Sequence, residues 1–345
     1  MKKIVIVGVL VALLAVGYIV GKPMYDLHFS VIDYNGEDKL IYINSGSSLD
    51  DVAGVMEAEG IIEKEPFLAF AEELDFTEEK VEPGKYNIVG GMKSKNLIYA
   101  LKNGNQEIKD VRITFNNCKT IEDMAGKVAP SIEADSAEIV GIAKHPETIE
   151  KYGFRDATFI SMFLPDTYEV GEWDMTAEEF IQFMADQYKA FWKEEDAKLK
   201  ASGLEQSEVA TLASILEAEQ GIHSTEWETI AGLYLNRVRR GMKLESDPTA
   251  KYCWGDELEG VQRILTEHLK KDCPYNTYLY AGLPPGPIRM PSKKALRAVL
   301  NAEDHNYIFM CARPDDSGLH NFAETYSQHL ANARKFWKYM DSRGY

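Results

Sequence analysis

The amino-acid sequence predicts a mixed α+β protein that follows an N-terminal transmembrane helix. Three patterns support this fold class: an uncharged, mostly apolar segment at residues 4–20, a strand–turn–helix pattern that occurs twice between residues 39 and 126, and amphipathic helical patterns after residue 176. At 345 residues the chain is long enough for two or three domains. We expect a cytoplasmic tip and anchor at residues 1–22, a linker at 23–37, a small βα subdomain at 38–105 and a larger α+β domain at 106–345.

The N-terminal segment has the composition of a membrane anchor. Lys2 and Lys3 precede the uncharged residues 4–20, which as a helix would span roughly 26 Å, near the lower limit for crossing a bilayer. A cleaved signal peptide usually has a shorter apolar region that ends in small residues, and residues 18–23 lack an A-x-A pattern. We therefore expect an uncleaved helix, with the N-terminus in the cytoplasm and everything beyond about Lys22 outside the membrane.

Strands and helices alternate through residues 38–105. Alternating apolar and polar residues predict a strand at 39–43, and a cap at Ser48 begins a helix with apolar residues at helical spacing. A second helix is predicted at 65–74, with proline in its first turn. The turn at 83–86 leads into another strand, and a helix follows at 96–102.

The same pattern begins again with a strand at 111–114 and a helix capped by Thr120. Residues 48–54 and 120–126 keep Asp, Ala and Gly in register. This strand–turn–helix unit resembles the opening of LysM modules, which bind N-acetylglucosamine polymers, so we expect a LysM-like fold for residues 38–105. Any β–α unit needs a cap and an apolar stripe, so glycan binding by this part stays open.

The overall composition limits the classes of partner. Hydrophobic residues make up 45% of the chain and charged residues 27%, as in ordinary globular proteins. The formal net charge of −17 repels phosphate backbones, so we expect no nucleic-acid partner. A neutral polar polymer such as a glycan remains compatible, and some of the 18 tyrosines and 5 tryptophans could stack on its sugar rings.

A helix predicted at residues 207–220 ends with two carboxylates, Glu217 and Glu219. Positions two apart on a helix point about 200° from each other, so the two side chains cannot act as a close pair. Glu219 continues the apolar face and suits a structural role that holds a neighbouring donor. Small residues surround Glu217, which leaves space for a ligand, and the apolar flank would raise its pKa toward that of a general acid. The pattern alone favours a solvated glutamate near a helix end.

The next segments contain further polar candidates. A long helix is predicted from Thr176 to about Lys200, and a capping box at 225–228 begins another that ends at Gly241. Asn236 and Arg237 lie near its C-terminal end, where a cation suits the helix dipole. Asp247 precedes a proline and either caps a helix at Thr249 or faces a cleft, and capping is the simpler role.

Two loops rich in tyrosine, proline and glycine follow. Tyr275, Asn276, Thr277 and Tyr278 offer side chains that stack on a sugar ring or bind its acetamido group. The segment 282–288, which includes Pro285, forms a rigid turn beside them, and a surface loop without function is the alternative.

The cysteines and histidines predict no cofactor. The four cysteines lack zinc-ligand spacing, and the chain has no HExxH, Walker A or GxGxxG motif, so we expect neither metal nor nucleotide. A Cys253–Cys273 disulfide is conceivable outside the cytoplasm, although free buried cysteines are the commoner case.

Taken together, the motifs after the apolar segment resemble the endolytic murein transglycosylase (YceG-like) family. Their order and spacing match that family across Glu217-Ala218-Glu219, Asn236-Arg237 with Gly241-Met242, Asp247-Pro248-Thr249, residues 274–278 and 282–288, together with the segment 164–168, His320-x-Phe322 and His329. One stretch departs from the family pattern: residues 115–118 stand where the family usually has an acidic-glycine turn.

The resemblance implies cleavage, without water, of the β-1,4 bond between N-acetylmuramic acid and N-acetylglucosamine within a peptidoglycan strand. Glu217 would protonate the leaving oxygen and then act as base on the muramoyl 6-hydroxyl, which closes a 1,6-anhydro ring. The implied substrate-binding residues are Glu219, Asn236, Arg237, Asp247, Thr249, Tyr275, Asn276, Thr277, Tyr278 and Pro285.

Two alternatives remain at this stage. A lysozyme-like hydrolase would pair Glu217 with Asp247, because hydrolysis normally needs two carboxylates. A membrane-anchored, non-catalytic scaffold would bind glycan and recruit synthesis enzymes. The family resemblance places the protein in the bacterial cytoplasmic membrane beside peptidoglycan synthases, where cleavage would limit the length of nascent strands.

Overall fold

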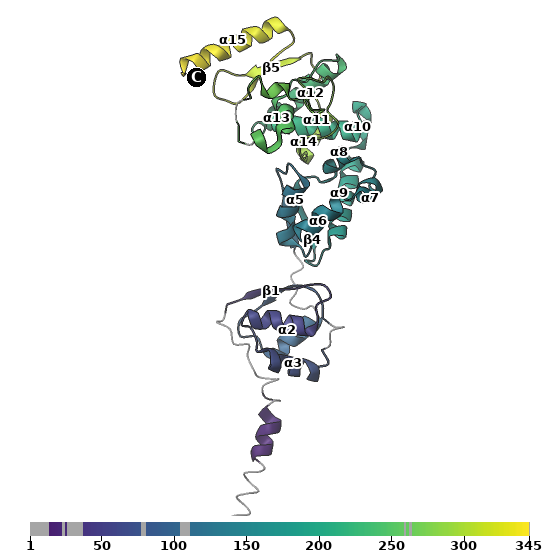
Figure 1. Cartoon of the computed structure of the whole chain (residues 1–345), viewed down its shortest axis with the longest axis vertical. Helices are drawn as coiled ribbons and strands as arrows, with labels where there is room; N and C mark the ends of the chain where they lie inside the picture. The colour runs from purple at the N-terminus through teal and green to yellow at the C-terminus, as the bar shows by residue number, and fades with distance from the viewer. Residues whose placement is uncertain are drawn as a thin grey trace, which may run out of the picture. The chain divides into compact units, whose positions relative to one another are not determined.

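The computed structural model describes residues 14–22, 25, 37–76, 81–103, 111–258, 260–261 and 264–344. The chain divides into two compact units (Figure 1). The first comprises the chain up to Arg112 together with Ser131–Ala134 and Glu169–Thr176, and the second comprises Ile113–Pro130, Asp135–Tyr168 and Ala177–Tyr345. The fold class is mixed α+β as predicted, mostly helical with small two-stranded sheets.

The first unit contains a β–α–α–β arrangement followed by one more helix. Its elements are β1 (Lys39–Ile43), α2 (Leu49–Ala58), α3 (Lys64–Glu73), β2 (Gly84–Ile88) and α4 (Ser94–Asn103). The two strands pair antiparallel, with Lys39 opposite Ile88 and Ile43 opposite Gly84. Alternation along each strand places one face in the core, where the fully buried Tyr86 packs among aliphatic side chains from the helices. The strand at 39–43 and the Ser48 cap are confirmed.

The predicted membrane anchor lies largely outside the described residues, because residues 1–13 are not among them. Residues 14–22 are helical and exposed. No helix within the described part of the chain combines the length and the apolar composition that a membrane crossing requires. The anchor is therefore a prediction from the sequence.

Strand β3 (Val111–Phe115) pairs with β4 (Asp166–Gly171) in a second small sheet. The elements between them are α5 (Ile121–Val128), α6 (Ser136–Ala143), α7 (Pro146–Lys151) and α8 (Asp156–Phe159), with 3-10 turns at Ala129–Ser131 and Ile160–Met162. Thr120 caps α5 as predicted. In the segment 115–118, the backbone carbonyl of Cys118 accepts a hydrogen bond of 3.0 Å from Met290 N, so this departure from the family pattern packs against the loop after residue 288.

The rest of the second unit is built around helix α11 (Gln206–Glu219). Its remaining helices are α9 (Ala177–Glu194), α10 (Asp196–Ser202), α12 (Trp227–Arg239), α13 (Asp247–Trp254), α14 (Lys293–Leu300) and α15 (Tyr326–Ser342), with 3-10 turns at Ser224–Glu226, Gly255–Leu258 and His268–Lys270. Every side chain from Val209 to Leu216 is buried, because α12, α13 and α14 all pack on α11. Strands β5 (Phe309–Ala312) and β6 (His320–Ala323) form an antiparallel hairpin.

Two helix predictions need correction. The helix predicted from Thr176 to Lys200 is broken at Glu195, whose buried carboxylate accepts a hydrogen bond of 2.5 Å from Arg297 Nε. The predicted capping box at 225–228 does not form. Residues Ser224–Glu226 make a 3-10 turn, α12 begins at Trp227, and the Glu226 side chain takes part in a buried polar network instead.

Candidate active site

Two cavities lie within the described residues of the second unit. The first has a volume of about 390 Å³ and the second of about 550 Å³. The first is lined by Glu219, Leu233, Tyr234, Arg237, Leu244, Glu245, Asp247, Tyr278, Phe309, Met310, Cys311, Ala312, His320, Tyr326 and His329. The second is lined by Lys119, Thr120, Ala218, Glu219, Asp247, Pro248, Lys251, Tyr252, Gly255, Asp256, Leu258, Gly260, Ile264, Ile288 and Arg289. Glu219 and Asp247 are the residues common to both linings, so two carboxylates mark the place where the cavities adjoin.

Glu219 is the last residue of α11. Its Oε2 accepts a hydrogen bond of 2.8 Å from the hydroxyl of the buried Ser246. Burial raises the pKa of Glu219, and the negative charge of Asp247 adds to this effect, whereas the Ser246 hydrogen bond and His320 oppose it. A carboxyl group that keeps its proton to a higher pH is suited to donate it to a leaving group.

Glu217 lies on another side of the same helix. Its Oε2 accepts a hydrogen bond of 2.9 Å from the backbone N–H of Ser292, the residue that caps α14. The hydroxyl of Ser292 in turn accepts from Ala295 N at 3.2 Å. Glu217 therefore satisfies a backbone donor at the start of α14, and it lines neither of the two cavities.

Asp247 faces the cavities rather than capping a helix. Helix α13 begins at Asp247 and has Ser246 at its N-cap position, without a side-chain capping bond. The hydroxyl of Tyr278 donates to Asp247 Oδ1 at 2.6 Å. Burial and this carboxylate together raise the pKa of Tyr278 far above its ordinary value. Of the two roles open to Asp247 from the sequence, the structure thus selects the cleft.

Asn236 and Arg237 hold backbone segments in place. Asn236 Nδ2 donates to the carbonyls of His305 at 2.6 Å and Tyr307 at 3.1 Å. Arg237 is 7% exposed; its Nε donates to Ile308 O at 2.6 Å, and its Nη1 donates to the carbonyls of residues 243 and 244 and to the Glu245 carboxylate at 3.0–3.1 Å. Arg237 still lines the first cavity, whereas Asn236 lines neither.

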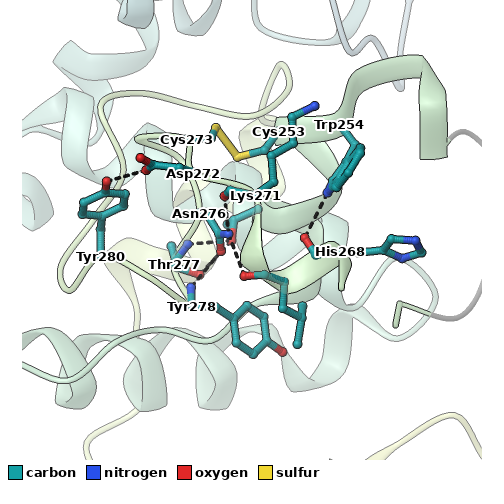
Figure 2. The surroundings of a disulfide bond; sticks show 12 residues. Cys253, Trp254, His268, Lys271, Asp272, Cys273, Asn276, Thr277, Tyr278 and Tyr280 are labelled. Atoms are coloured by element: carbon teal, nitrogen blue, oxygen red, sulfur yellow. Dashed lines mark hydrogen bonds between the residues drawn. A yellow bond between two sulfur atoms is a disulfide. The ribbon is translucent and has the colours of Figure 1, made fainter. Parts of the chain in front are cut away.

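Thr249, Asn276 and Thr277 are buried in the wall of the site. The Thr249 and Thr277 hydroxyls lie 2.7 Å apart, and Thr277 Oγ1 accepts from Ser246 N at 3.1 Å. Asn276 Nδ2 donates to the carbonyls of Leu269 at 3.0 Å and Lys271 at 2.9 Å (Figure 2). These three side chains fix the segment that carries Tyr278, and none of them lines either cavity.

Tyr275 and Pro285 are not among the residues that line the two cavities. The Tyr275 ring packs on Tyr252, with centroids 4.6 Å apart, and burial raises the pKa of Tyr275 to about 12. Pro285 is exposed. The adjacent Gly286 is required for packing, because a Cβ there would lie 1.9 Å from the carbonyl oxygen of Ala157.

A disulfide joins Cys253 in α13 to Cys273, just before the segment 274–278 (Figure 2). Trp254 Nε1 donates to His268 O at 2.9 Å inside the loop that the disulfide closes. Gly255, Asp256, Leu258, Gly260 and Ile264 of this loop line the second cavity. The alternative left open by the sequence is therefore resolved in favour of a bonded pair, while Cys118 and Cys311 are free.

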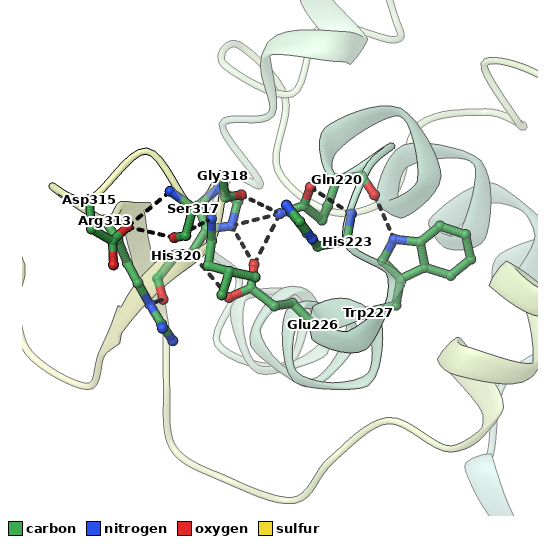
Figure 3. Close-up of polar contacts among 10 residues, drawn as sticks. Gln220, His223, Glu226, Trp227, Arg313, Asp315, Ser317, Gly318 and His320 are labelled. Atoms are coloured by element: carbon green, nitrogen blue, oxygen red, sulfur yellow. Dashed lines mark hydrogen bonds and ion pairs between the residues drawn. The ribbon is translucent and has the colours of Figure 1, made fainter.

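A polar network includes His320, which lines the first cavity. Figure 3 shows the hydrogen bonds of this network. Glu226 Oε2 contacts His320 Nδ1 at 2.9 Å and accepts from Gln220 Nε2 at 3.0 Å, while Glu226 Oε1 accepts from the backbone N–H of His320 at 2.9 Å. Gln220 Nε2 also donates to Gly318 O at 2.9 Å. The network thus connects the end of α11, the start of α12 and β6.

Comparison with known proteins shows the family of the chain. The YceG-like family matches residues 41–335. The chain belongs to the YceG-like family. Within the described residues of this YceG-like protein, no group of three or more His, Cys, Asp or Glu side chains is placed to hold a metal ion.

Two curated relatives are similar to this YceG-like protein along most of its length. The endolytic murein transglycosylase of Bacillus subtilis is 24% identical over 311 residues, covering 86% of this chain and 84% of the relative. The protein of the same name from Streptococcus pneumoniae strain D39 is 25% identical over 311 residues, covering 81% of this chain but 55% of the relative. A crystal structure of a putative yceG-like protein from Listeria monocytogenes shares the fold, with a TM-score of 0.56, 22% identity and coverage of 86% of this chain and 98% of that chain.

The sequence of this YceG-like protein did not predict the hydrogen-bond network that joins Gln220, Glu226 and His320. Gln220 and Glu226 gave no motif of their own, and Glu226 lay inside a pattern that predicted a helix cap. The signal that pointed toward the network was His320, which was noticed as a family feature without a role. Its partner Glu226 lies 94 residues earlier in the chain, a separation that local patterns do not connect.

Proposed function

We propose that this YceG-like protein is an endolytic murein transglycosylase in which Glu219 is the general acid and base. The observation that carries this proposal is the position of Glu219, a carboxyl with a raised pKa where the two cavities adjoin. The names of the relatives from B. subtilis and S. pneumoniae support the reaction class. The substrate would be peptidoglycan glycan strands, cut between N-acetylmuramic acid and N-acetylglucosamine.

The reaction needs one carboxyl group and no water. Protonated Glu219 gives its proton to the glycosidic oxygen, and the bond from the muramoyl C1 to that oxygen breaks. The muramoyl 6-hydroxyl then attacks C1, and its proton passes to the Glu219 carboxylate. The products are a 1,6-anhydro-muramoyl end and a free 4-hydroxyl on N-acetylglucosamine, and Glu219 is protonated again.

The choice of Glu219 differs from the prediction made from the sequence, which gave this role to Glu217. That prediction has not been tested, but the geometry favours Glu219. Glu217 accepts from Ser292 N and lines neither cavity, whereas Glu219 lines both. We therefore propose a structural role for Glu217 at the start of α14.

The predicted substrate-binding residues fall into groups. Arg237, Asp247 and Tyr278 line the first cavity. Asp247 and Tyr278 are proposed to contact the glycan, whereas Arg237 is proposed to hold backbone segments, because its guanidinium donates to their carbonyls. Asn236, Thr249, Asn276 and Thr277 are proposed to act by holding the walls, because their polar atoms bond to other parts of the protein. Tyr275 and Pro285 remain predictions from the sequence.

A lysozyme-like hydrolase is the second candidate, and the observation that favours it is the presence of Asp247 beside Glu219 in both linings. Hydrolysis uses two carboxylates with an attacking water or an enzyme nucleophile. Mass spectrometry of products from purified glycan strands separates the two reactions. We expect 1,6-anhydro ends from the wild type and loss of cleavage in Glu219→Gln; reducing ends would instead establish the hydrolase.

The proposal includes a place in the cell. The apolar residues 4–20 would anchor the protein in the bacterial cytoplasmic membrane, with the N-terminus in the cytoplasm and everything beyond about Lys22 outside. Such a tether would confine cleavage to nascent strands near peptidoglycan synthases and so limit strand length. Protease added to spheroplasts is expected to digest both units; protection of the second unit would contradict this orientation.

The β–α–α–β arrangement of the first unit supports a LysM-like role in glycan binding. Its cavity of about 250 Å³ is lined by Tyr42, Asp51 and Val55 among others. A Tyr42→Ala variant is therefore expected to bind N-acetylglucosamine oligomers more weakly than the wild type, as isothermal titration calorimetry would show. If Glu219→Gln retained every effect of the protein in cells, the non-catalytic scaffold would be the better description.

A further inference from the structure

The buried Glu226–His320 pair has no part in the cleavage chemistry proposed for Glu219, yet it lies at the same cavity. Glu226 is 7% exposed, and three donors from Gln220 and His320 surround its carboxylate. A buried carboxylate is costly unless it is paired and hydrogen-bonded, so this arrangement holds the histidine ring firmly. The backbone of His320 is fixed as well, since Arg313 Nε donates to its carbonyl at 2.9 Å.

The hydrogen-bond pattern decides which ring nitrogen of His320 carries the proton. Gln220 Nε2 has two hydrogens, and both are used by Glu226 Oε2 at 3.0 Å and Gly318 O at 2.9 Å. The longer contact of 3.4 Å between Gln220 Nε2 and His320 Nδ1 therefore lacks a hydrogen. Because a carboxylate only accepts, Nδ1 must donate to Glu226 at 2.9 Å. In the neutral ring, Nε2 is then an acceptor.

His320 lines the first cavity together with Glu219 and Asp247. Within the described part of the chain, Nε2 of His320 makes no hydrogen bond. Some other polar groups of the lining are already occupied, because Tyr278 donates to Asp247 and the Arg237 guanidinium donates to carbonyls and Glu245. Nδ1 of His329, which also belongs to the lining, is buried without a hydrogen-bond partner among the described residues. The Nε2 atom is thus an oriented acceptor at the cavity wall.

We infer that His320, oriented by Glu226, binds the glycan by accepting a hydrogen bond from a sugar hydroxyl at Nε2 beside Glu219. The identity of the ligand rests on the proposed function. Sugar hydroxyls are donors that a fixed imidazole acceptor complements, and Glu226 keeps the ring in the accepting tautomer. Glu226 is accordingly a positioning residue, and His320 is a substrate-binding residue.

Two substitutions of His320 separate this role from a structural one. In His320→Asn, the amide nitrogen occupies the place of Nδ1 and keeps the bond to Glu226, while the atom at the Nε2 position is lost. In His320→Gln, the amide group reaches the Nε2 position but the bond to Glu226 is lost. If His320 were purely structural, Asn would preserve glycan binding better than Gln. If His320 binds the ligand, Gln preserves glycan binding better than Asn.

The full chain in detergent, with Glu219→Gln present to prevent turnover, would be titrated with purified peptide-free glycan strands. His320→Asn is expected to weaken binding roughly tenfold, as for loss of one hydrogen bond, with an unchanged unfolding midpoint. His320→Gln is expected to bind more tightly than His320→Asn despite a lower midpoint. Unchanged binding in His320→Asn, or weaker binding in His320→Gln than in His320→Asn, would overturn the inference.

A measurement on the unsubstituted ring tests the tautomer even if a variant fails to fold. With 15N-labelled histidine, the Nε2 resonance of His320 is expected to be that of an unprotonated nitrogen and to move when glycan strands are added. A protonated Nε2 would overturn the inference, and so would a resonance that does not move on glycan binding. Failure of the wild type to cleave strands would overturn the proposed function alone, because glycan binding and the tautomer are measured without cleavage.

Glu226→Gln gives a further check, with Glu228→Gln as its matched control. Both residues lie at the start of α12, but Glu228 is exposed. A glutamine at 226 keeps one accepting oxygen in place of two, so it cannot hold the backbone N–H and Nδ1 of His320 as the carboxylate does. Weaker glycan binding is therefore expected for Glu226→Gln and unchanged binding for Glu228→Gln. Equal binding by both variants would contradict the positioning role of Glu226.

Discussion

Arg237 allows a sharp test of the structural account, because the sequence predicted a substrate contact and the structure shows a buried backbone clamp. Arg237→Ala removes hydrogen bonds to the carbonyls of Ile308, Lys243 and Leu244. It also removes the ion pair with Glu245, but that carboxylate is 51% exposed and contributes little because solvent screens it.

The expected loss follows from the three carbonyl acceptors. At about 1 kcal/mol for each net hydrogen bond, Arg237→Ala should cost about 3 kcal/mol in free energy of unfolding. For a unit of this size, each kcal/mol lowers the melting temperature by about 2–4 °C, so the expected shift is about 6–12 °C. Thermal unfolding of the full chain, followed by circular dichroism in detergent, measures it.

Arg239→Ala is the matched control, since Arg239 is exposed on the same helix and its Nη1 lies 3.4 Å from Asn236 Oδ1 in a marginal contact. Its melting temperature should stay within about 2 °C of the wild type, as for ordinary surface substitutions. If Arg237→Ala melted like Arg239→Ala but lost glycan binding, the clamp would be refuted and the sequence-based prediction of a substrate contact would be the better one.

Three further predictions concern stability. At pH values above 4.5, Glu219→Gln should unfold at a higher midpoint than the wild type. The reason is that burial raises the pKa of Glu219, so the wild type loses stability as pH rises through that raised pKa. The gain should vanish below the ordinary pKa of 4.5, as unfolding curves at several pH values would show. Gly286→Ala should lower the midpoint, because the new Cβ would lie 1.9 Å from the Ala157 carbonyl oxygen. Replacing Cys253 and Cys273 by serine should cost roughly 3 kcal/mol, since the bond closes a loop with a sequence separation of 20.

Controls and contrary outcomes are available for each prediction. Gly126→Ala, in α5 with open space around its Cβ position, should be neutral or stabilising, whereas equal effects of Gly126→Ala and Gly286→Ala would contradict the close approach. Replacement of the free Cys311 by serine should not reproduce the loss in free energy of unfolding that removal of the disulfide causes. If the unfolding midpoint of Glu219→Gln changed with pH as it does in the wild type, burial of the Glu219 carboxylate would not lower the stability of the protein.

Local structure was largely predictable because local rules determine it. Alternation of apolar residues gave β1, and the Ser48 and Thr120 caps placed the starts of α2 and α5, because each signal lies within a few residues of the element it controls. The break at Glu195 was not predictable in the same way. The buried pair with Arg297 joins residues 102 positions apart, and helical periodicity gives no sign of it.

In the candidate active site, too, contacts between distant parts of the sequence could not be predicted from local patterns. Helix geometry correctly separated Glu217 from Glu219, but which one faces a cavity depends on α14 and on Ser246, which approach α11 from distant parts of the sequence. Burial raises the pKa of Glu219, which continues the apolar face of the helix. Motif membership alone could not distinguish the two carboxylates.

Rates of strand cleavage by Glu219→Gln and Glu217→Gln, measured side by side with the wild type on purified glycan strands, test the central claim most directly. General acid–base catalysis contributes roughly 100-fold to 10,000-fold in rate, so Glu219→Gln should be slower by about that factor. Glu217→Gln should keep most of the wild-type rate, since a glutamine oxygen can still accept from Ser292 N. A Glu217→Gln variant that folds but does not cleave, beside an active Glu219→Gln, would contradict the account.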